Sequence, residues 1–320
     1  MRAVRVALLA FCPMLLSGTA RATYSIAAAD TATKQVGGAV TSCVGSLDLA
    51  IVYGGLPGHG VVHVQAQLDP SSKGKTAAVQ LLGQGAAPVD IIAMIASAPF
   101  DANFDVRQYG IVDVTGRAAG FTGAKARVYK EDRQGQSGPL VYSVQGNILK
   151  GKAVLDQAEA AFRGVAGCDL ADRLMLALEA GALNGEGDSR CTPAGIPADS
   201  AFIEVDEATG SPGGFLKLSV TSTSPESAVV RLRAQYDDWR RRHPCPVVLV
   251  DSGANGDGGS GHMGAGACEV GPRRPSSNWV VWLIGVIVGG FVVRRRRILS
   301  LFCVLAAAAP ALADESTPAD

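Results

Sequence analysis

The segment TYSIAAADTATKQVGGAVTS, from Thr23 to Ser42, holds two runs of apolar and small residues with a polar stretch between them. Residues 23–29 and 36–42 favour extended backbone, and the intervening DTATK has the composition of a turn. This pattern predicts a β-hairpin whose first strand begins at Thr23.

The residues upstream of the hairpin have the three parts of a secretory signal peptide. Arg2 and Arg5 give a positive start, and the apolar run Val6–Leu16 is too short to span a bilayer. The small-x-small triplet at 20–22 (ARA) is what signal peptidase cuts behind. We therefore expect residues 1–22 to be removed, Thr23 to become the first residue, and the protein to be exported to the periplasm or cell surface. A buried N-terminal helix is the alternative.

The residues downstream of the hairpin alternate between strand and helix patterns. Further strands are expected at 61–67, 107–114, 118–122, 141–145, 200–205 and 215–220, and helices at 75–82, 88–96, 152–163, 170–180 and 226–242. Strands come in a group, then helices, then strands again. This order predicts an α+β domain over residues 23–246 with helices packed outside sheets, rather than a regular βαβ array.

The composition excludes some classes of function. The 29 Lys and Arg residues balance 29 Asp and Glu residues, so no global field attracts nucleic acid. The sequence contains no GxSxG, Walker, HExxH or CxxC motif. His59 and His63 have helical spacing, but Gly58, Gly60 and the Val61-Val62 pair favour a loop and a strand, so we expect no metal site. No cofactor is expected either.

The C-terminal part begins with a Gly- and Ser-rich linker at 247–278. Residues 279–293 (WVVWLIGVIVGGFVV) are apolar and precede the Arg block 294–297, which is how a membrane segment is anchored. This arrangement resembles the MYXO-CTERM sorting tail of surface proteins and implies a membrane partner. Residues 298–320 extend beyond that pattern. They have the composition of a second signal peptide, which suggests read-through, or they form a helical hairpin around the Arg block.

Five cysteines remain after the signal peptide and the apolar tail are set aside, and an exported protein is expected to form disulfides. Cys168 and Cys191 flank one predicted helix and its Gly-rich exit, so we pair them. Cys245 and Cys268 form a looser possible pair, which leaves Cys43 as a buried, inert thiol.

Thr23 carries chemistry if it becomes the first residue. An N-terminal threonine has a hydroxyl and a free α-amine, and the amine can take the hydroxyl proton directly or through a water. Signal cleavage creates this pair without self-processing. The alternative is that Thr23 is an ordinary first residue.

Several further stretches resemble an uncharacterised family known as domain of unknown function 1028, over about Thr23 to Trp239. They are TYSIAAAD at 23–30, GAVTS at 38–42, DVRQYGIVD at 105–113, FTG at 121–123, YSVQGNIL at 142–149, LADRL at 170–174 and GEGDSR at 185–190. The resemblance implies the four-layer αββα sandwich of N-terminal-nucleophile (Ntn) hydrolases, and hydrolysis of an amide bond with Thr23 as nucleophile and base.

Supporting roles are expected for residues in these motifs. The Gly146 N–H and the Asn147 side chain are candidate oxyanion donors, or form only a turn. Ser42 is expected at the end of the strand beside Thr23, where it can touch the nucleophile.

Candidate substrate-binding residues are Arg107, Gln108 and Asp188. Arg107 can pair a substrate carboxylate bidentately, or form a structural ion pair with Asp113 or Asp188. Asp188 either lines a pocket or caps the disulfide region.

The leading hypothesis is an exported amidohydrolase that acts on a small amide or peptide. The alternatives are a non-catalytic ligand-binding module and a structural surface protein with the same fold. Homo-oligomers remain open.

Overall fold

The computed structural model describes residues 23–164, 167–221 and 224–245. These residues form ten β-strands in two antiparallel sheets and five α-helices, so the fold is mixed α/β. Within these ranges no helix is both long enough and apolar enough to cross a bilayer. The predicted signal peptide, linker, apolar segment, Arg block and extension all lie outside the described residues.

The larger sheet has six strands in the order β10-β9-β2-β1-β8-β7. Its strands are β1 (Thr23–Asp30), β2 (Val36–Ser42), β7 (Glu131–Ser137), β8 (Leu140–Asn147), β9 (Ser200–Asp206) and β10 (Leu216–Thr221). β1 and β2 form the predicted hairpin and pair from Thr23 with Ser42 to Ala29 with Val36. β1 therefore lies inside the sheet, with β2 on one side and β8 on the other.

The smaller sheet has four strands in the order β3-β4-β5-β6. They are β3 (Tyr53–Leu56), β4 (Gly60–Ala66), β5 (Arg107–Asp113) and β6 (Ala118–Thr122).

Five helices cover the outer faces of the two sheets. They are α1 (Lys73–Gly83), α2 (Pro88–Ile95), α3 (Ala153–Gly164), α4 (Leu170–Gly181) and α5 (Ala228–Arg242). Short 3-10 turns occur at Leu49–Ile51, Phe104–Val106, Leu183–Gly185 and Ser189–Ala194. α5 shows why these segments are amphipathic helices: Val229, Leu232, Tyr236 and Trp239 recur at helical spacing and are its buried face.

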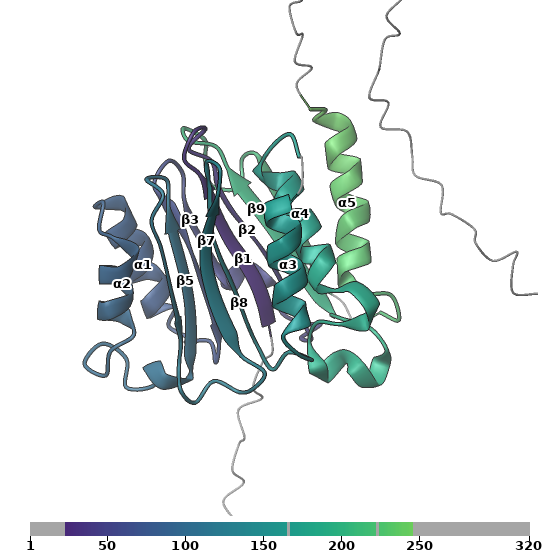
Figure 1. Ribbon diagram of the computed structural model, residues 1–320, viewed down its shortest axis with the longest axis horizontal. Helices are drawn as coiled ribbons and strands as arrows, with labels where there is room; N and C mark the ends of the chain where they lie inside the picture. The colour runs from purple at the N-terminus through teal and green to yellow at the C-terminus, as the bar shows by residue number, and fades with distance from the viewer. Residues whose placement is uncertain (1–22, 165–166, 222–223, 246–320) are drawn as a thin grey trace, which may run out of the picture. The chain divides into compact units, whose positions relative to one another are not determined.

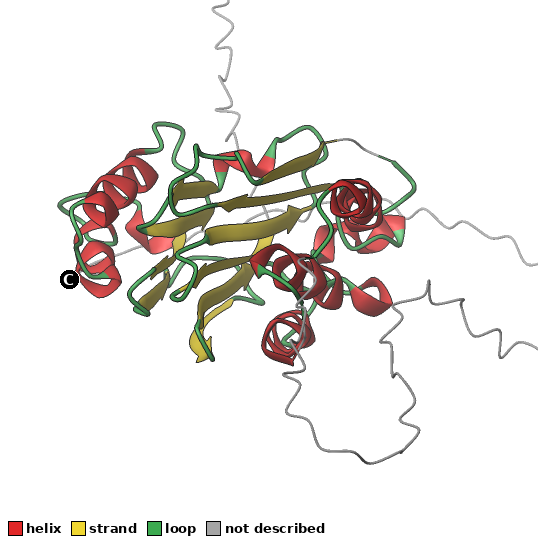
Figure 2. Ribbon diagram, turned by 90° about the horizontal axis from the view of Figure 1, so that it is seen from above, coloured by secondary structure: helices red, strands yellow, loops and turns green. Residues whose placement is uncertain are grey.

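The two groups of helices lie on opposite sides of the strands (Figures 1 and 2). α1 and α2 pack against the smaller sheet, and α3, α4 and α5 pack against the larger one. The inner faces of the two sheets meet where β1 packs against β4 and β5.

Side chains of β1 alternate between these two environments, as a strand requires. Tyr24 and Ile26 join the apolar core under α3 and α4. Ala27 and Ala29 face the smaller sheet. Thr23 has the same parity as Ala27 and Ala29, so its side chain points into the layer between the sheets.

That inner layer contains polar side chains and glycines. The buried imidazole of His63 on β4 occupies the space above Gly38 on β2, where a Cβ would lie 2.0 Å from Nε2. In the same way, a Cβ on Gly110 of β5 would lie 1.9 Å from Oε1 of Gln145 on β8. The missing side chains at these two glycines make room for long polar ones from the facing sheet.

The disulfides differ from the predicted pairing. Cys43 is bonded to Cys191 and Cys168 to Cys245, at Cα–Cα distances of 5.7 Å in both cases. The prediction of a Cys168–Cys191 bond was therefore wrong, as was that of a free Cys43. The looser Cys245–Cys268 pair was also wrong, because Cys245 is bonded to Cys168. Helix α4 begins just after Cys168 and leads away from it, whereas the end of β2 and the end of α5 bring the actual partners close.

Candidate functional site

Thr23 is the first residue of β1 and lies between two strand ends. Across the β1–β2 ladder it is opposite Ser42, the last residue of β2. Across the β1–β8 ladder it is opposite Asn147, the last residue of β8. Antiparallel pairing thus brings three of the predicted site residues together at one end of the larger sheet.

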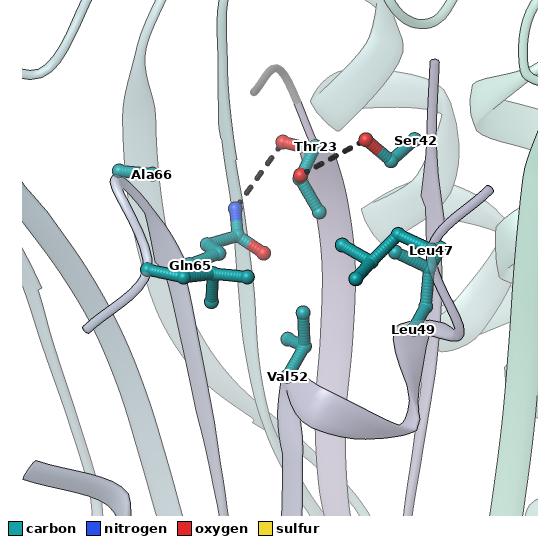
Figure 3. Close-up of a pocket in the computed structure, with 8 residues that line it drawn as sticks. Thr23, Ser42, Leu47, Leu49, Val52, Gln65 and Ala66 are labelled. Carbon is teal, nitrogen blue, oxygen red and sulfur yellow. Dashed lines mark hydrogen bonds between the residues drawn. The ribbon is translucent and has the colours of Figure 1, made fainter. Parts of the chain in front are cut away.

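The hydroxyl and the carbonyl of Thr23 both have polar neighbours (Figure 3). Thr23 Oγ1 donates to Ser42 Oγ at 3.3 Å, and Gln65 Nε2 donates to the Thr23 carbonyl at 3.2 Å. Ser42 reaches Thr23 from β2 in the same sheet and Gln65 reaches it from β4 in the facing sheet, so both sheets hold Thr23 in position.

A small hollow adjoins the Thr23 side chain. We call it the Thr23 hollow, and its volume is about 10 Å³. It is lined by Thr23, Ser42, Leu47, Leu49, Val52, Gln65, Ala66 and Leu68. A hollow of this size has room for about one water, and Figure 3 shows Leu47, Leu49 and Val52 around it.

Gln65 connects Thr23 to the rest of the inner layer. Its Oε1 accepts from Ser25 Oγ at 2.7 Å, and its Nε2 also donates to Gln108 Oε1 at 2.7 Å. Gln108 Nε2 in turn donates to the Gly146 carbonyl at 3.0 Å. Gln108 is fully buried, so the structure places it as a support beneath the site, away from any accessible surface.

Gln65 was not among the site residues predicted from the sequence. The signal was present in residues 61–67 (VVHVQAQ), because His63, Gln65 and Gln67 alternate with valine or alanine. That alternation puts His63 and Gln65 on one face of the strand, and here that face is the inner layer. Gln67 lies beyond the end of β4 and is exposed.

Gly146 and Asn147 are the last two residues of β8, so the alternative that they only form a turn is wrong. Gly146 is opposite Tyr24 on one side and Glu131 on the other. An N–H inside a sheet is directed at a neighbouring strand, which makes Gly146 a poor oxyanion donor. Asn147, at the strand end, lines a pocket of about 190 Å³ that we call the Asn147 pocket.

Asp188 and Arg190 hold the far side of Ser42. Arg190 Nη2 donates to Ser42 Oγ at 3.4 Å and to Asp188 Oδ2 at 2.6 Å. Asp188 Oδ2 also accepts from the Cys43 backbone N–H at 2.7 Å. The buried Asp188 carboxylate therefore fixes the residue that follows Ser42, next to the Cys43–Cys191 disulfide.

Arg107 does not reach this site. Its Nε donates to Asp101 Oδ2 at 2.7 Å, and its Nη1 donates to the Gln67 carbonyl at 2.5 Å. Burial is the largest single influence on the pKa of Asp101 and raises it, but the hydrogen bonds from Arg107 and the Asn103 N–H, together with the charge of Arg107, lower the pKa below its usual value. Arg107 thus forms a structural ion pair, although with neither of the partners that the sequence suggested.

The two histidines with helical spacing lie in different surroundings. His59 is exposed in a turn, where its Nδ1 lies 2.9 Å from the Pro57 carbonyl oxygen. His63 is completely buried. Its pKa is lowered to about 3, mainly by burial and to a smaller extent by the positive charge of Lys75. We see no arrangement in which both rings would bind one ion.

Comparisons with known proteins identify relatives of the chain. No curated protein matches it. A crystal structure of a DUF1028 protein from Silicibacter pomeroyi is similar in fold, with a TM-score of 0.56 and 24% sequence identity over 68% of this chain and 89% of that one. The model of the family of unknown function DUF1028 matches residues 23–240. The chain therefore belongs to the DUF1028 family.

Proposed function

We propose that the mature protein is an exported amidohydrolase in which Thr23 is the nucleophile. The observation that carries this proposal is the position of the Thr23 hydroxyl, beside a hollow and between Ser42 and Asn147 at the end of the larger sheet. Two facing sheets with helices outside them are compatible with the αββα sandwich of Ntn hydrolases. Such a fold alone does not fix a function, so the support for this proposal comes from the residues around Thr23.

The first half of the reaction is acylation of Thr23. Oγ1 attacks the carbonyl carbon of the amide, and the hydroxyl proton passes to the α-amine of Thr23 directly or through a water in the Thr23 hollow. The carbonyl oxygen becomes negative in the tetrahedral intermediate, and we assign its stabilisation to the side-chain amide of Asn147, which is opposite Thr23 on β8. When the C–N bond breaks, the proton goes from the α-ammonium to the leaving amine.

The second half is hydrolysis of the ester on Oγ1. The α-amine, again neutral, takes a proton from a water that attacks the ester carbonyl. The C–O bond then breaks, the proton returns to Oγ1, and a carboxylic acid leaves. Ser42 and Gln65 keep the Thr23 side chain and backbone in place through both halves.

The α-amine exists only if the chain begins at Thr23. Cleavage after Ala22 would provide it, and the C-terminal tail would hold the protein at a membrane or cell surface. Mass spectrometry of the exported protein tests the first point, because any other N-terminus removes the base. A chain produced with one extra residue, starting at Ala22, should be inactive although its fold is unchanged.

The nucleophile is tested with a panel of small amides and dipeptides. Thr23→Ala should abolish hydrolysis, and Thr23→Ser should retain part of it. The matched control is Thr33→Ala, an exposed threonine in the hairpin turn at the other end of β1. Hydrolysis by Thr23→Ala at the rate of the unchanged protein contradicts the proposal. Binding of an amide without hydrolysis by either protein favours the alternative of a ligand-binding module.

A further inference from the structure

The Asn147 pocket adjoins the Thr23 site. Asn147, directly opposite Thr23 on β8, lines the pocket. Ala66 lines both this pocket and the Thr23 hollow. The Thr23 hollow and the Asn147 pocket are therefore neighbours that share Ala66 as a lining residue.

The backbone at Ala66 is unusual. Ala66 ends β4 with φ of 78°, in the left-handed region that a residue with a Cβ seldom adopts. Such conformations cluster at functional sites, where the surrounding structure holds them. This conformation therefore occurs at the end of β4, in the residue that lines both spaces.

The charged groups of the pocket are all positive. Lys125 and Arg127 line it together with Ala66, Asn147 and three uncharged residues, and no acidic residue does so. Lys125 Nζ is paired with Asp105 Oδ2 at 2.6 Å. Among the ion pairs of the described residues, none involves Arg127. The pocket thus keeps a net positive charge.

The loop that carries the two cations is tied to the site. The Ile148 N–H donates to the Arg127 carbonyl at 3.1 Å, and the Lys125 N–H donates to the Asp105 carbonyl at 2.8 Å. The first of these bonds places the Arg127 backbone beside the residue that follows Asn147. Both cations are therefore presented from a loop anchored at its two sides.

The size of the pocket limits what it accepts. Its volume of about 190 Å³ is below the roughly 300–1,000 Å³ of pockets that bind drug-sized ligands. It suits a group about as large as one amino acid.

We propose that the Asn147 pocket is a subsite for a carboxylate, and that the amides which the protein binds are acidic ones of the N-acyl amino acid or peptide class, with the free carboxylate between Arg127 and Lys125. This inference rests on the proposed function for the orientation of the amide toward Thr23. The binding preference itself does not depend on catalysis.

The test uses the full chain, exported and purified, with Thr23→Ala so that no turnover occurs. Calorimetric titration compares N-acetyl amino acids with the corresponding N-acetyl amino acid amides, which have the same size and lack the charge. We expect the acids to bind about fivefold more tightly, the effect of one partly exposed ion pair. Arg127→Gln should bring the ratio close to one, and added salt should do the same for the unchanged pocket.

The matched control is Lys152→Gln, which removes a cation that does not line the pocket. It should leave the preference unchanged. Equal binding of acids and amides, a preference that persists in Arg127→Gln, or no binding of any acid would each overturn the subsite. In those cases, hydrolysis of neutral amides by the protein that retains Thr23 would still support the proposed function. Conversely, a preference for acids in a protein that hydrolyses nothing would leave the subsite standing and remove the hydrolase.

Discussion

The imidazole of His63 lies directly over Gly38, and a Cβ on that glycine would come within 2.0 Å of Nε2. The contact joins β4 of the smaller sheet to β2 of the larger one, and β2 is the strand that pairs with β1. Packing between the sheets therefore depends on the absence of a side chain at residue 38.

Gly38→Ala should destabilise the protein. Because His63 is completely buried and cannot move away freely, the added methyl group overpacks the inner layer, at a cost of about 1–3 kcal/mol. Urea denaturation measures the change. Gly151→Ala is the control, since a Cβ there meets nothing within 4 Å. Equal stability of the two variants would contradict the packing that we describe.

Stability should fall as the pH is lowered from 7 to 5. The pKa of His63 is lowered from 6.5 to about 3 in the folded protein, so the unfolded chain binds the proton first. The stabilisation is complete above pH 6.5 and is lost as the pH falls toward 3, by about 2 kcal/mol between pH 7 and pH 5.

His63→Leu removes the titrating group, and should remove this part of the pH dependence. His59→Leu is the exposed control and should leave it in place. If His63→Leu is too unstable to measure, His63→Gln gives the same comparison. An unchanged slope in either His63 variant would show that another group is responsible.

Gln65→Glu should weaken both the fold and the site. A carboxylate cannot donate to the Thr23 carbonyl and faces the Gln108 oxygen, so two hydrogen bonds are lost at a cost of about 1–3 kcal/mol. Because Gln65 holds the backbone of Thr23, kcat of the proposed hydrolysis should fall more than KM rises. Gln136→Glu, at an exposed position, is the matched control. Loss of stability with kcat unchanged would limit Gln65 to a structural role.

The disulfide pairs predict a specific peptide map. Under non-reducing conditions, proteolysis should yield peptides joined through Cys43–Cys191 and through Cys168–Cys245. Their sequence separations of 148 and 77 residues correspond to about 4–5 kcal/mol each in the chain-entropy model. Cys43→Ser with Cys191→Ser should lower stability by up to that amount. A peptide that joins Cys168 to Cys191 would contradict the observed pairing.

Local pattern was enough to predict most of the elements. The hairpin at 23–42 was predicted correctly because its two runs are separated by a strong turn signal. Ser42 and Asn147 lie beside Thr23 because all three residues are at strand ends, and the sequence predicted each of the three strands to within two residues at either end.

Features that depend on distant contacts were missed. β7 (EDRQGQS) is a polar edge strand and has no apolar alternation to reveal it. β3 (YGGL) is short, and two of its four residues are glycines, which are uncommon in strands. The disulfide partners and the Asp101 partner of Arg107 are likewise set by how strands and helices pack, which spacing along the chain does not encode.

The gap at Gly110, filled by the Gln145 side chain from the opposite sheet, has a consequence for evolution in this family. Relatives with a larger residue in place of Gly110 must have a shorter side chain in place of Gln145, since the two side chains cannot occupy the same volume. Substitutions at positions 110 and 145 should therefore occur together across homologous sequences. Such covariation would indicate that the two sheets keep the same separation in those relatives.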